Sequence, residues 1–408
     1  MSPEALEQIV LPLRTAAWQA EAEAWLRQLV EISSHSADRI GCQAMAEALV
    51  SLYTLPGLSV VRHPDAAGHQ GDHLSFATQA SAQAPFALLI GHLDTVFPAA
   101  VFSGYHPLPD GNGRRARGPG VYDMKGGLVV MAFALRALAQ AGLLSQVPLR
   151  GVIVSDEEIG SPSGRTTILE VARGAACALG FESGRAGDAI ITRRKGIAAY
   201  QARATGRSAH AGNAHREGAN AIWALARFVD GAQRLTDYDR GITVSVGRIE
   251  GGCSRNVVPD RAEALLDVRF VTAADAAAIE AALRQEAIRA AVPGTQVELH
   301  GGVTRQPLER TPGSMRLLAD YGRCQREAGL GSAEAPLLGG GSDASTVASL
   351  GIPAIDGLGP RGSGFHTLAE EVELDTILPK AEALVRFLLT SEMLRAPDSA
   401  DGGSGRGP

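Results

Sequence analysis

The chain has 408 residues, 45% of them hydrophobic, which is enough for more than one sizeable core. Its net charge is −6 with acidic and basic residues interspersed, so it lacks the basic patch that nucleic-acid binding requires. The apolar run at residues 126–135 is too short to span a membrane, which takes about 20 residues. These features argue against nucleic-acid and membrane partners.

The amino terminus lacks the charged-then-apolar layout of a secretory signal. The four cysteines are scattered and form no CxxC pair, which favours reduced thiols in a cytoplasmic protein. Glycine accounts for 48 residues, well above the usual share of about 7%, and much of it lies in short clusters beside polar residues. Such clusters suit loops that bring backbone close to a ligand.

The first part of the chain alternates between helical and strand patterns. Apolar periodicity predicts helices at residues 3–31, 39–53, 125–141 and 166–173, with a long loop at 104–120. Strands are expected at residues 59–62, 72–77, 86–90, 149–154 and 177–181. Because strands alternate with helices, we expect an α/β fold with a mostly parallel sheet, whose ligands collect beyond the carboxyl ends of the strands.

The pattern changes after residue 193. Strands at 197–205, 242–249, 262–270 and 296–300, with helices at 217–234 and 274–291, give the order βαββαβ, which resembles a ferredoxin-like split unit. We therefore expect residues 194–306 to form an inserted α+β domain between two parts of the first domain, 1–193 and 307–395. Residues 396–408 are expected to form a disordered tail.

One stretch, FALLIGHLDTVFP at residues 86–98, places polar side chains directly after a buried strand. Side chains two apart on an extended chain point to the same side, so those of His92 and Asp94 emerge together. This arrangement suits a metal-binding histidine that is oriented by a carboxylate. A hydrogen-bonded loop histidine is the commoner alternative for these two residues alone.

Further metal-ligand candidates follow other strand ends or lie in glycine-rich loops: Asp123, Glu157, Glu158, Glu182 and His366. Each has a structural alternative, since an acidic residue can stabilise a helix start and acidic pairs are usually solvated. Together they complete a two-metal site, which needs a bridging carboxylate and a shared water. One Asp, two Glu and a hydroxide balance the charge of two zinc ions. Adjacent extended residues point to opposite sides, so one glutamate of the pair can ligate while the other acts as general base.

Eight motifs occur in order between about residues 20 and 390: GHLDTVFP, GPGVYDMKGG, SDEEIGS, FES, GRSAHAG, NVVPDRAEALLDVR, GGGSD and FHT. They resemble the co-catalytic dizinc exopeptidase family, which includes glutamate carboxypeptidase, acetylornithine deacetylase, succinyl-diaminopimelate desuccinylase, aminoacylase and peptidase T. The glutamate carboxypeptidase branch looks most similar. The resemblance implies a dizinc exopeptidase domain with an inserted lid domain, and a homodimer formed through the lid.

The resemblance also implies roles for single residues. Asp123 would bridge two metals, His92 and Glu182 would complete one site, and Glu158 and His366 the other. Glu157 would be the general base, with Asp94 behind His92. The expected cofactors are two Zn²⁺ per chain, with Co²⁺ or Mn²⁺ as alternatives.

Other residues are implied to bind the substrate. His210 would reach across the dimer interface to stabilise the developing oxyanion in the partner's site. Asn256 and Arg269 resemble lid residues that hold the α-carboxylate of the substrate, although Arg269 could equally form a salt bridge on its strand face. Gly340 and Gly341 of GGGSD would line the same pocket with backbone donors.

The resemblance defines the substrate less narrowly than it defines the reaction. Family members with Glu at position 182 tend to be carboxypeptidases or deacylases, so the expected substrate is an N-acyl or N-peptidyl amino acid with a free α-carboxylate. Glutamate carboxypeptidase has a Lys that helps bind the glutamate side chain, and the corresponding stretch here, RAGDAIIT, contains no Lys. That enzyme also has an Arg directly before a Pro. Gln306 occupies this position here, and Arg305 lies one place earlier. Glutamate specificity is therefore open.

Four other functions compare with this one, and the sequence argues against two of them. An N-acyl amino acid deacylase is the main alternative, and a metal-free binding protein that has lost catalysis is a second. GPGVYD does not match the dinucleotide-binding pattern GxGxxG, because Asp123 occupies the position of the third glycine. A serine hydrolase fails because the sequence has no GxSxG elbow.

Overall fold

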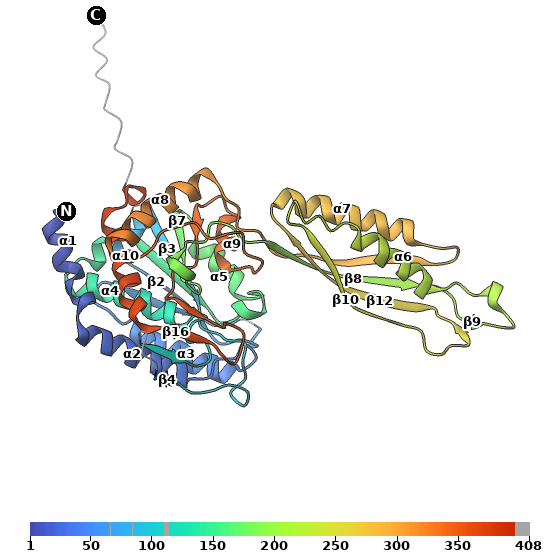
Figure 1. Ribbon diagram of the computed structural model, residues 1–408, viewed down its shortest axis with the longest axis horizontal. Coiled ribbons are helices and arrows are strands. Elements are labelled where there is room, and N and C mark those ends of the chain that lie inside the picture. The colour runs from blue at the N-terminus through green and yellow to red at the C-terminus, as the bar shows by residue number, and fades with distance from the viewer. Residues whose placement is uncertain (66, 84, 110–113, 396–408) are drawn as a thin grey trace, which may run out of the picture. The chain divides into compact units, whose positions relative to one another are not determined.

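The structure is a computed structural model that describes residues 1–65, 67–83, 85–109 and 114–395 (Figure 1). The tail expected at 396–408 lies outside the described residues. The chain divides into two compact units. Unit 1 comprises Met1–Thr192, Arg310–Ala335 and the chain from Thr346 onward, and unit 2 comprises Arg193–Glu309 and Pro336–Ser345.

These limits differ from the predicted domains in one respect. The segment Pro336–Ser345 falls in unit 2, whereas the sequence analysis assigned it to the first domain. Its backbone pairs there, because the N–H of Lys195 donates to the carbonyl of Leu338 at 2.8 Å. A buried ion pair between Arg305 and Asp343, 2.7 Å apart, adds a second attachment. Both contacts join residues that are distant in sequence, which local patterns do not reveal.

Unit 1 is built on a six-stranded sheet in the order β1-β2-β6-β3-β7-β14. β3 pairs in parallel with β6 and β7, and β14 pairs in parallel with β7, whereas β1 and β2 add an antiparallel edge. The sheet is therefore mostly parallel, as predicted. The strands are β1 (Ser59–His63), β2 (His73–Ala77), β3 (Phe86–His92), β6 (Leu149–Val154), β7 (Ala175–Gly180) and β14 (Ala354–Ile355).

Helices cover the sheet of unit 1, and all seven residues of β3 are buried. Helix α4 packs on β3 and against α10 (Figure 1). Ala87 and Leu89 join the large core that these helices share, while Leu88 and Ile90 are buried on the other face. The helices are α1 (Pro3–Val10), α2 (Ala16–Glu31), α3 (Arg39–Leu52), α4 (Lys125–Gln140), α5 (Gly164–Val171), α8 (Pro312–Glu327), α9 (Asp343–Ala348) and α10 (Ile377–Thr390).

Two local predictions for unit 1 were wrong. The helix expected at 3–31 is interrupted by a 3-10 turn at Leu11–Arg14 that contains Pro12, after which Thr15 caps α2 by accepting from the N–H of Trp18. The loop expected at 104–120 contains β4 (His106–Leu108) and β5 (Arg115–Arg117). They belong to a second sheet, β15-β16-β5-β4, with β15 at Gly362–Ser363 and β16 at Glu371–Glu373.

Unit 2 is a four-stranded antiparallel sheet in the order β10-β12-β8-β13, with α6 and α7 packed against each other and on the sheet. Every second residue of β8 is buried, which fits a sheet with helices on one face only. The elements are β8 (Gly196–Thr205), β9 (Ala209–His210), α6 (Ala221–Gln233), β10 (Thr243–Gly251), β11 (Val257–Val258), β12 (Arg261–Phe270), α7 (Ala273–Ala290) and β13 (Gln296–Arg305).

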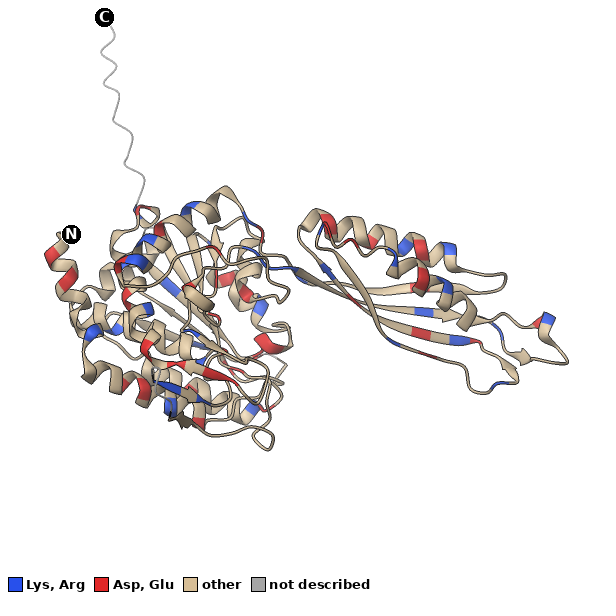
Figure 2. Cartoon of the chain, in the orientation of Figure 1, with Lys and Arg blue, Asp and Glu red and all other residues tan. Residues whose placement is uncertain are grey.

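Charged residues of both signs are interspersed over each unit (Figure 2). In the part of the chain that the structure describes, none of the helices is long and apolar enough to cross a bilayer. All four cysteines are free thiols, and only Cys253 is exposed.

Candidate metal centre

His92 is the last residue of β3, and its side chain is almost completely buried. Gly91 lets the strand end close to α4, since a Cβ there would lie 2.8 Å from Cε of Met124. Nδ1 of His92 lies 3.0 Å from the backbone carbonyl oxygen of Asp94. A carbonyl oxygen only accepts, so Nδ1 carries the proton and the lone pair of Nε2 is available to a metal.

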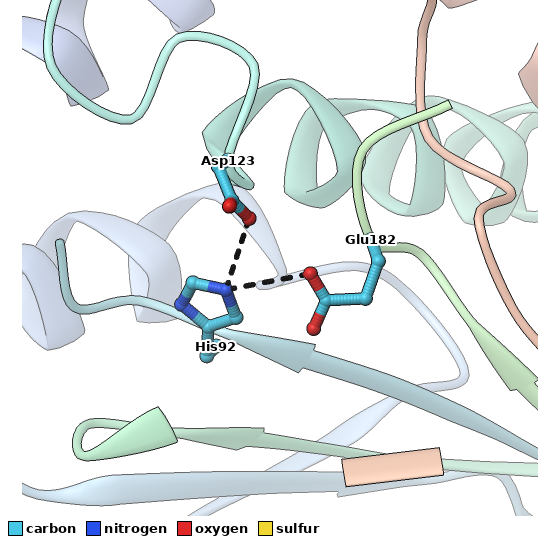
Figure 3. A group of neighbouring side chains, drawn as sticks. All are labelled: His92, Asp123 and Glu182. Atoms are coloured by element: carbon cyan, nitrogen blue, oxygen red, sulfur yellow. Dashed lines mark ion pairs between the residues drawn. The ribbon is translucent and has the colours of Figure 1, made fainter. Parts of the chain in front are cut away.

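Nε2 of His92 faces two carboxylates, as Figure 3 shows. It lies 3.4 Å from Oδ1 of Asp123 and 3.7 Å from Oε2 of Glu182. Glu182 comes just after β7, and Asp123 comes just before α4. The three residues form a group whose ligand atoms all lie within 4.8 Å of one another.

A second group shares Asp123 with the first. Nε2 of His366 lies 3.4 Å from Oδ2 of Asp123 and 3.1 Å from Oε2 of Glu158. Asp123, Glu158 and His366 also have ligand atoms within 4.8 Å of one another. The two oxygens of Asp123 therefore face different histidines, which is the position that a bridging carboxylate requires.

The donor set fits a pair of cations. Oδ1 of Asp123 is buried and has no hydrogen-bond partner among the described residues, although a buried carboxylate oxygen normally has one. Imidazole nitrogens and carboxylate oxygens are suitable ligands for zinc and similar divalent metals. Three carboxylates in one buried place also repel each other, and bound cations would remove that repulsion.

The pKa values reflect this crowding in the absence of metal. Burial raises the pKa of Glu182 to about 8 and that of Glu158 to about 7, and the charge of Asp123 adds to both shifts. Burial also acts on Asp123, but the neighbouring imidazoles of His366 and His92 hold its pKa well below the usual range. Hydrogen bonds that the His366 ring donates to Asp123 and Glu158 raise the pKa of His366 to about 10.

The carboxylate of Asp94 holds the glutamate pair in place. Its Oδ1 accepts from the N–H of Glu157 at 3.0 Å, and its Oδ2 accepts from the N–H of Glu158 at 3.1 Å. Oδ1 also lies 3.4 Å from Nδ1 of His92, farther than the backbone carbonyl of Asp94 itself. One buried carboxylate thus supports both the histidine and the turn that carries the two glutamates.

The two glutamates of that turn face different neighbours. Glu158 points at His366, as its 3.1 Å contact shows. Glu157 is half-buried and lies close enough to Glu182 for its charge to raise the pKa of that carboxyl. Glu157 is therefore beside the group of His92, Asp123 and Glu182 without being a member of it.

The remaining candidates belong to unit 2. Four of them, Arg269, Arg305, Gly340 and Gly341, lie in or against the segment Pro336–Ser345. Arg269 forms a two-pronged salt bridge with Asp267, at 2.7 and 2.9 Å, and also donates to the carbonyl of Gly339 at 3.2 Å. The strand-face salt bridge that the sequence left open is therefore present. Arg305 packs on Gly341, whose Cβ would lie 2.3 Å from its Cδ, and Arg194 donates to the carbonyl of Gly340 at 3.3 Å.

His210 and Asn256 are exposed and lie beside the paired strands β9 and β11 of unit 2. Nδ1 of His210 accepts from the N–H groups of Gly212 and Asn213 at 3.1 and 3.0 Å. The proton of the neutral ring is therefore on Nε2, which is the arrangement that can donate to an oxyanion. The carbonyl of Asn256 accepts from the N–H of Ala211 at 2.9 Å, which joins the two segments.

Three residues beside the metal groups escaped the sequence analysis. Ser36 donates from Oγ to Oδ2 of Asp94 at 2.6 Å. Gly127 is required on α4 because a Cβ would lie 2.0 Å from the carbonyl oxygen of Phe181. Glu370 accepts from backbone N–H groups beside Asp123. Only Glu370 gave a signal, as an acidic residue four places after His366.

Comparisons with known proteins decide the family. A model of the peptidase dimerisation domain matches residues 192–295. Carboxypeptidase G2 of Pseudomonas sp. (strain RS-16) is 28% identical over 366 residues, covering 89% of this chain and 88% of that protein. Succinyl-diaminopimelate desuccinylase of Cereibacter sphaeroides (strain KD131) is 30% identical over 292 residues, covering 66% of this chain and 73% of that protein. The chain belongs to the M20 peptidase family.

Solved structures of M20 proteins show the same fold. Aminopeptidase PepT from Bacillus cereus aligns with a TM-score of 0.74 at 23% identity, covering 91% of this chain and 98% of that one. The YXEP protein of Bacillus subtilis, described as a dinuclear metal-binding M20 peptidase, aligns with a TM-score of 0.68 at 16% identity, covering 92% and 98%. This M20 protein is accordingly a metal-dependent peptidase or amidohydrolase, and its two residue groups fit a dinuclear centre.

Proposed function

We propose that the protein hydrolyses the amide bond between an acyl or peptidyl group and an amino acid that has a free α-carboxylate. The observation that carries this proposal is the sharing of Asp123 between the two ligand groups, with Glu157 beside them. Both the similarity to carboxypeptidase G2 and the Glu at position 182 favour substrates of this class.

We assign His92, Asp123 and Glu182 to one metal, and Asp123, Glu158 and His366 to the other. Zn²⁺ is the proposed ion in both, because histidine and carboxylate ligands suit it, although Co²⁺ or Mn²⁺ can occupy such sites. When bound, the metals polarise the scissile carbonyl and acidify water. His92 is almost completely buried, whereas Asp123, Glu158 and Glu182 are partly buried and His366 is exposed.

Glu157 acts as the general acid and base. Its carboxylate takes a proton from the attacking water and returns it to the nitrogen of the leaving amino acid, so the proton balance closes within one turnover. Asp94 fixes the backbone of Glu157 through the 3.0 Å hydrogen bond. Nε2 of His210 would donate to the developing oxyanion.

Residues of unit 2 would bind the substrate. Arg269 and Asn256 would hold the α-carboxylate, and backbone N–H groups at Gly340 and Gly341 would add donors, with Arg305 beneath Gly341. A substrate carboxylate at Arg269 has to compete with Asp267, whose two oxygens already occupy the guanidinium. This competition predicts a low affinity for the α-carboxylate from Arg269 alone.

A homodimer formed through unit 2 is part of the proposal. Ile222 and Trp223 project from α6 with 39% and 58% of their surface exposed, and Ile249 on the edge strand β10 is 55% exposed. An edge strand beside exposed apolar side chains offers a self-complementary surface. Trp223→Asp should give a monomer in analytical ultracentrifugation, and an unchanged dimer would place the interface elsewhere. A cytoplasmic location remains a prediction from the sequence.

The deciding experiment is a hydrolysis screen with zinc supplied, using N-acyl amino acids and dipeptides varied at the carboxyl-terminal residue. Glu157→Gln should retain two metals per chain and lose most turnover, while Glu170→Gln, an exposed change on α5, should behave as wild type. Full activity of Glu157→Gln would refute the role of the base. Metal analysis that finds no zinc, with no hydrolysis, would instead favour a binding protein that has lost catalysis.

A further inference from the structure

Glu370 is a buried carboxylate that lies four residues after His366, immediately before β16, with 2% of its surface exposed. Its Oε1 accepts from the N–H of Tyr122 at 3.0 Å and from the N–H of Asp123 at 2.9 Å. Its Oε2 accepts from the N–H of Gly120 at 3.1 Å. A single side chain therefore binds three backbone donors of the loop that carries Asp123.

The backbone of Glu370 binds the same loop. Its carbonyl oxygen accepts from the N–H of Gly118 at 3.3 Å. Among the described residues, no Lys or Arg forms an ion pair with the Glu370 carboxylate. Lys125, a buried neighbour, donates from Nζ to the carbonyl of Ile32 instead. The negative charge of Glu370 is thus stabilised chiefly by backbone N–H groups, and a carboxylate without such donors would be costly to bury.

This side chain connects two segments of the metal centre. Asp123 belongs to both ligand groups, and His366 belongs to the second. The segment from His366 to Glu370 reaches Asp123 once through Nε2 of His366, at 3.4 Å, and again through the Glu370 carboxylate. Any movement of the loop at Gly120–Asp123 relative to His366 has to break at least one of these hydrogen bonds.

We propose that Glu370 is a positioning residue that fixes Asp123 relative to His366 and thereby sets the affinity for the metal held by Asp123, Glu158 and His366. The inference rests on the proposed metal centre but not on the proposed substrate. Outer groups that orient metal ligands typically contribute about 10–100-fold to metal affinity. Glu370 acts on the backbone of a ligand rather than on a ligand side chain, so it would not touch the substrate.

The number of acceptors explains why a carboxylate is needed here. A glutamine has the same size but only one oxygen, and its NH₂ group would face either the N–H of Gly120 or those of Tyr122 and Asp123. One or two buried N–H groups would then lose their acceptor. An aspartate is one methylene shorter and cannot reach all three donors from the same backbone position.

The test compares metal binding by the full-length metal-free protein and two variants, with Zn²⁺ titrated against a competing chelator. Glu370→Gln should bind one of its two zinc equivalents about 10–100-fold more weakly than wild type. At saturating zinc its kcat should recover while KM stays unchanged. Glu371→Gln is the matched control, because Glu371 is the adjacent residue and forms a partly exposed salt bridge with Arg115 at 2.7 Å. This control should bind both equivalents as wild type does.

Equal zinc affinity in Glu370→Gln and wild type would overturn the inference, as would equal weakening in Glu371→Gln. Absence of zinc binding by the wild type would overturn it together with the metal centre. If Glu370→Gln does not fold, hydrogen exchange of the wild-type protein tests whether Glu370 holds the loop that carries Asp123. The N–H groups of Gly120, Tyr122 and Asp123 should exchange slowly even without metal, and fast exchange would contradict the proposal. Because the zinc titration and the hydrogen exchange use no substrate, both still test the inference if the hydrolysis screen fails.

Discussion

The hydroxyl of Ser36 donates a 2.6 Å hydrogen bond to Oδ2 of Asp94 inside the protein, where neither side chain is exposed. Asp94 in turn accepts from the N–H groups of Glu157 and Glu158. Ser36 is not itself a ligand candidate, yet it supports the carboxylate that holds the proposed general base, Glu157, and a proposed metal ligand, Glu158.

Ser36→Ala should lower both zinc affinity and kcat, because Asp94 loses one of its three hydrogen-bond donors. A hydrogen bond to a charged group contributes about 1.5–3 kcal/mol, so the combined loss should be about tenfold or more. Ser34→Ala is the matched control, since Ser34 is equally buried but its hydroxyl has no hydrogen-bond partner in the part of the chain that the structure describes. Equal losses in the two variants would show that packing, and not the hydrogen bond, is responsible.

Metal should stabilise unit 1 and not unit 2, because all five ligand candidates belong to unit 1. At a free metal concentration 100 times Kd, the expected gain is about 2.7 kcal/mol per site in the free energy of unfolding. Hydrogen exchange with and without a chelator measures this separately for the two units. Protection should increase in β3 and β7 on metal addition, and an equal increase in β8 and β12 would contradict the assignment.

Lys380 should make unit 1 more stable as the pH rises through the alkaline range. This side chain is fully buried on α10, 3.3 Å from Asp188, and burial lowers its pKa to about 8 from the ordinary 10.5. Between these values the unfolded chain binds more protons than the folded one, so the free energy of unfolding rises with pH. Below about pH 8 Lys380 is protonated in both the folded and the unfolded chain. The buried charge then lowers the free energy of unfolding by its full amount, which no longer changes with pH.

The size of this effect follows from the shift, at about 1.4 kcal/mol for each pKa unit and therefore up to about 3 kcal/mol. Chemical denaturation of wild type and Lys380→Met from pH 7 to pH 10.5 measures it, because the methionine does not titrate. The difference in unfolding free energy between the two proteins should move in favour of the wild type as the pH rises. A constant difference would mean that Lys380 titrates normally in the folded protein.

Gly127→Ala should destabilise unit 1 by about 1–3 kcal/mol or more, because the new Cβ would meet the carbonyl oxygen of Phe181 at 2.0 Å. Since Glu182 follows Phe181 directly, zinc affinity should fall as well. Gly302→Ala is a suitable control, as its Cβ would have no neighbour within 4 Å. Denaturation curves and zinc titrations of both variants test the prediction, and a stable Gly127→Ala variant would contradict it.

The centre of the sheet in unit 1 was predictable because β3 and β6 are largely buried runs with clear ends. The run before His92 and the one before Glu182 each stop at a polar residue, and parallel pairing then brings those ends to one edge. The sheet of unit 2 was predictable for a related reason, since the alternation in β8 reflects a single covered face. Local sequence patterns report both features directly.

Other features depend on partners that local patterns do not show. β5 pairs with β16, so that Ala116 lies opposite Val372, and neither strand is long enough to be recognised alone. The hydrogen bonds of Ser36 and Glu370 end on side-chain and backbone groups that are far away in sequence. By contrast, Pro12 and Thr15 did mark the interruption of the first helix, and the apolar periodicity across 3–31 concealed it.

The segment Pro336–Ser345 has a practical consequence for dissecting this protein. A fragment made of residues 193–309 would keep every strand of the unit 2 sheet. It would nevertheless lose the contact of Arg305 with Asp343 and that of Arg269 with Gly339. An excised unit 2 should therefore be expressed with this decapeptide rejoined through a linker. The boundary that matters for protein engineering is thus set by a remote stretch of chain and not by the ends of the insertion.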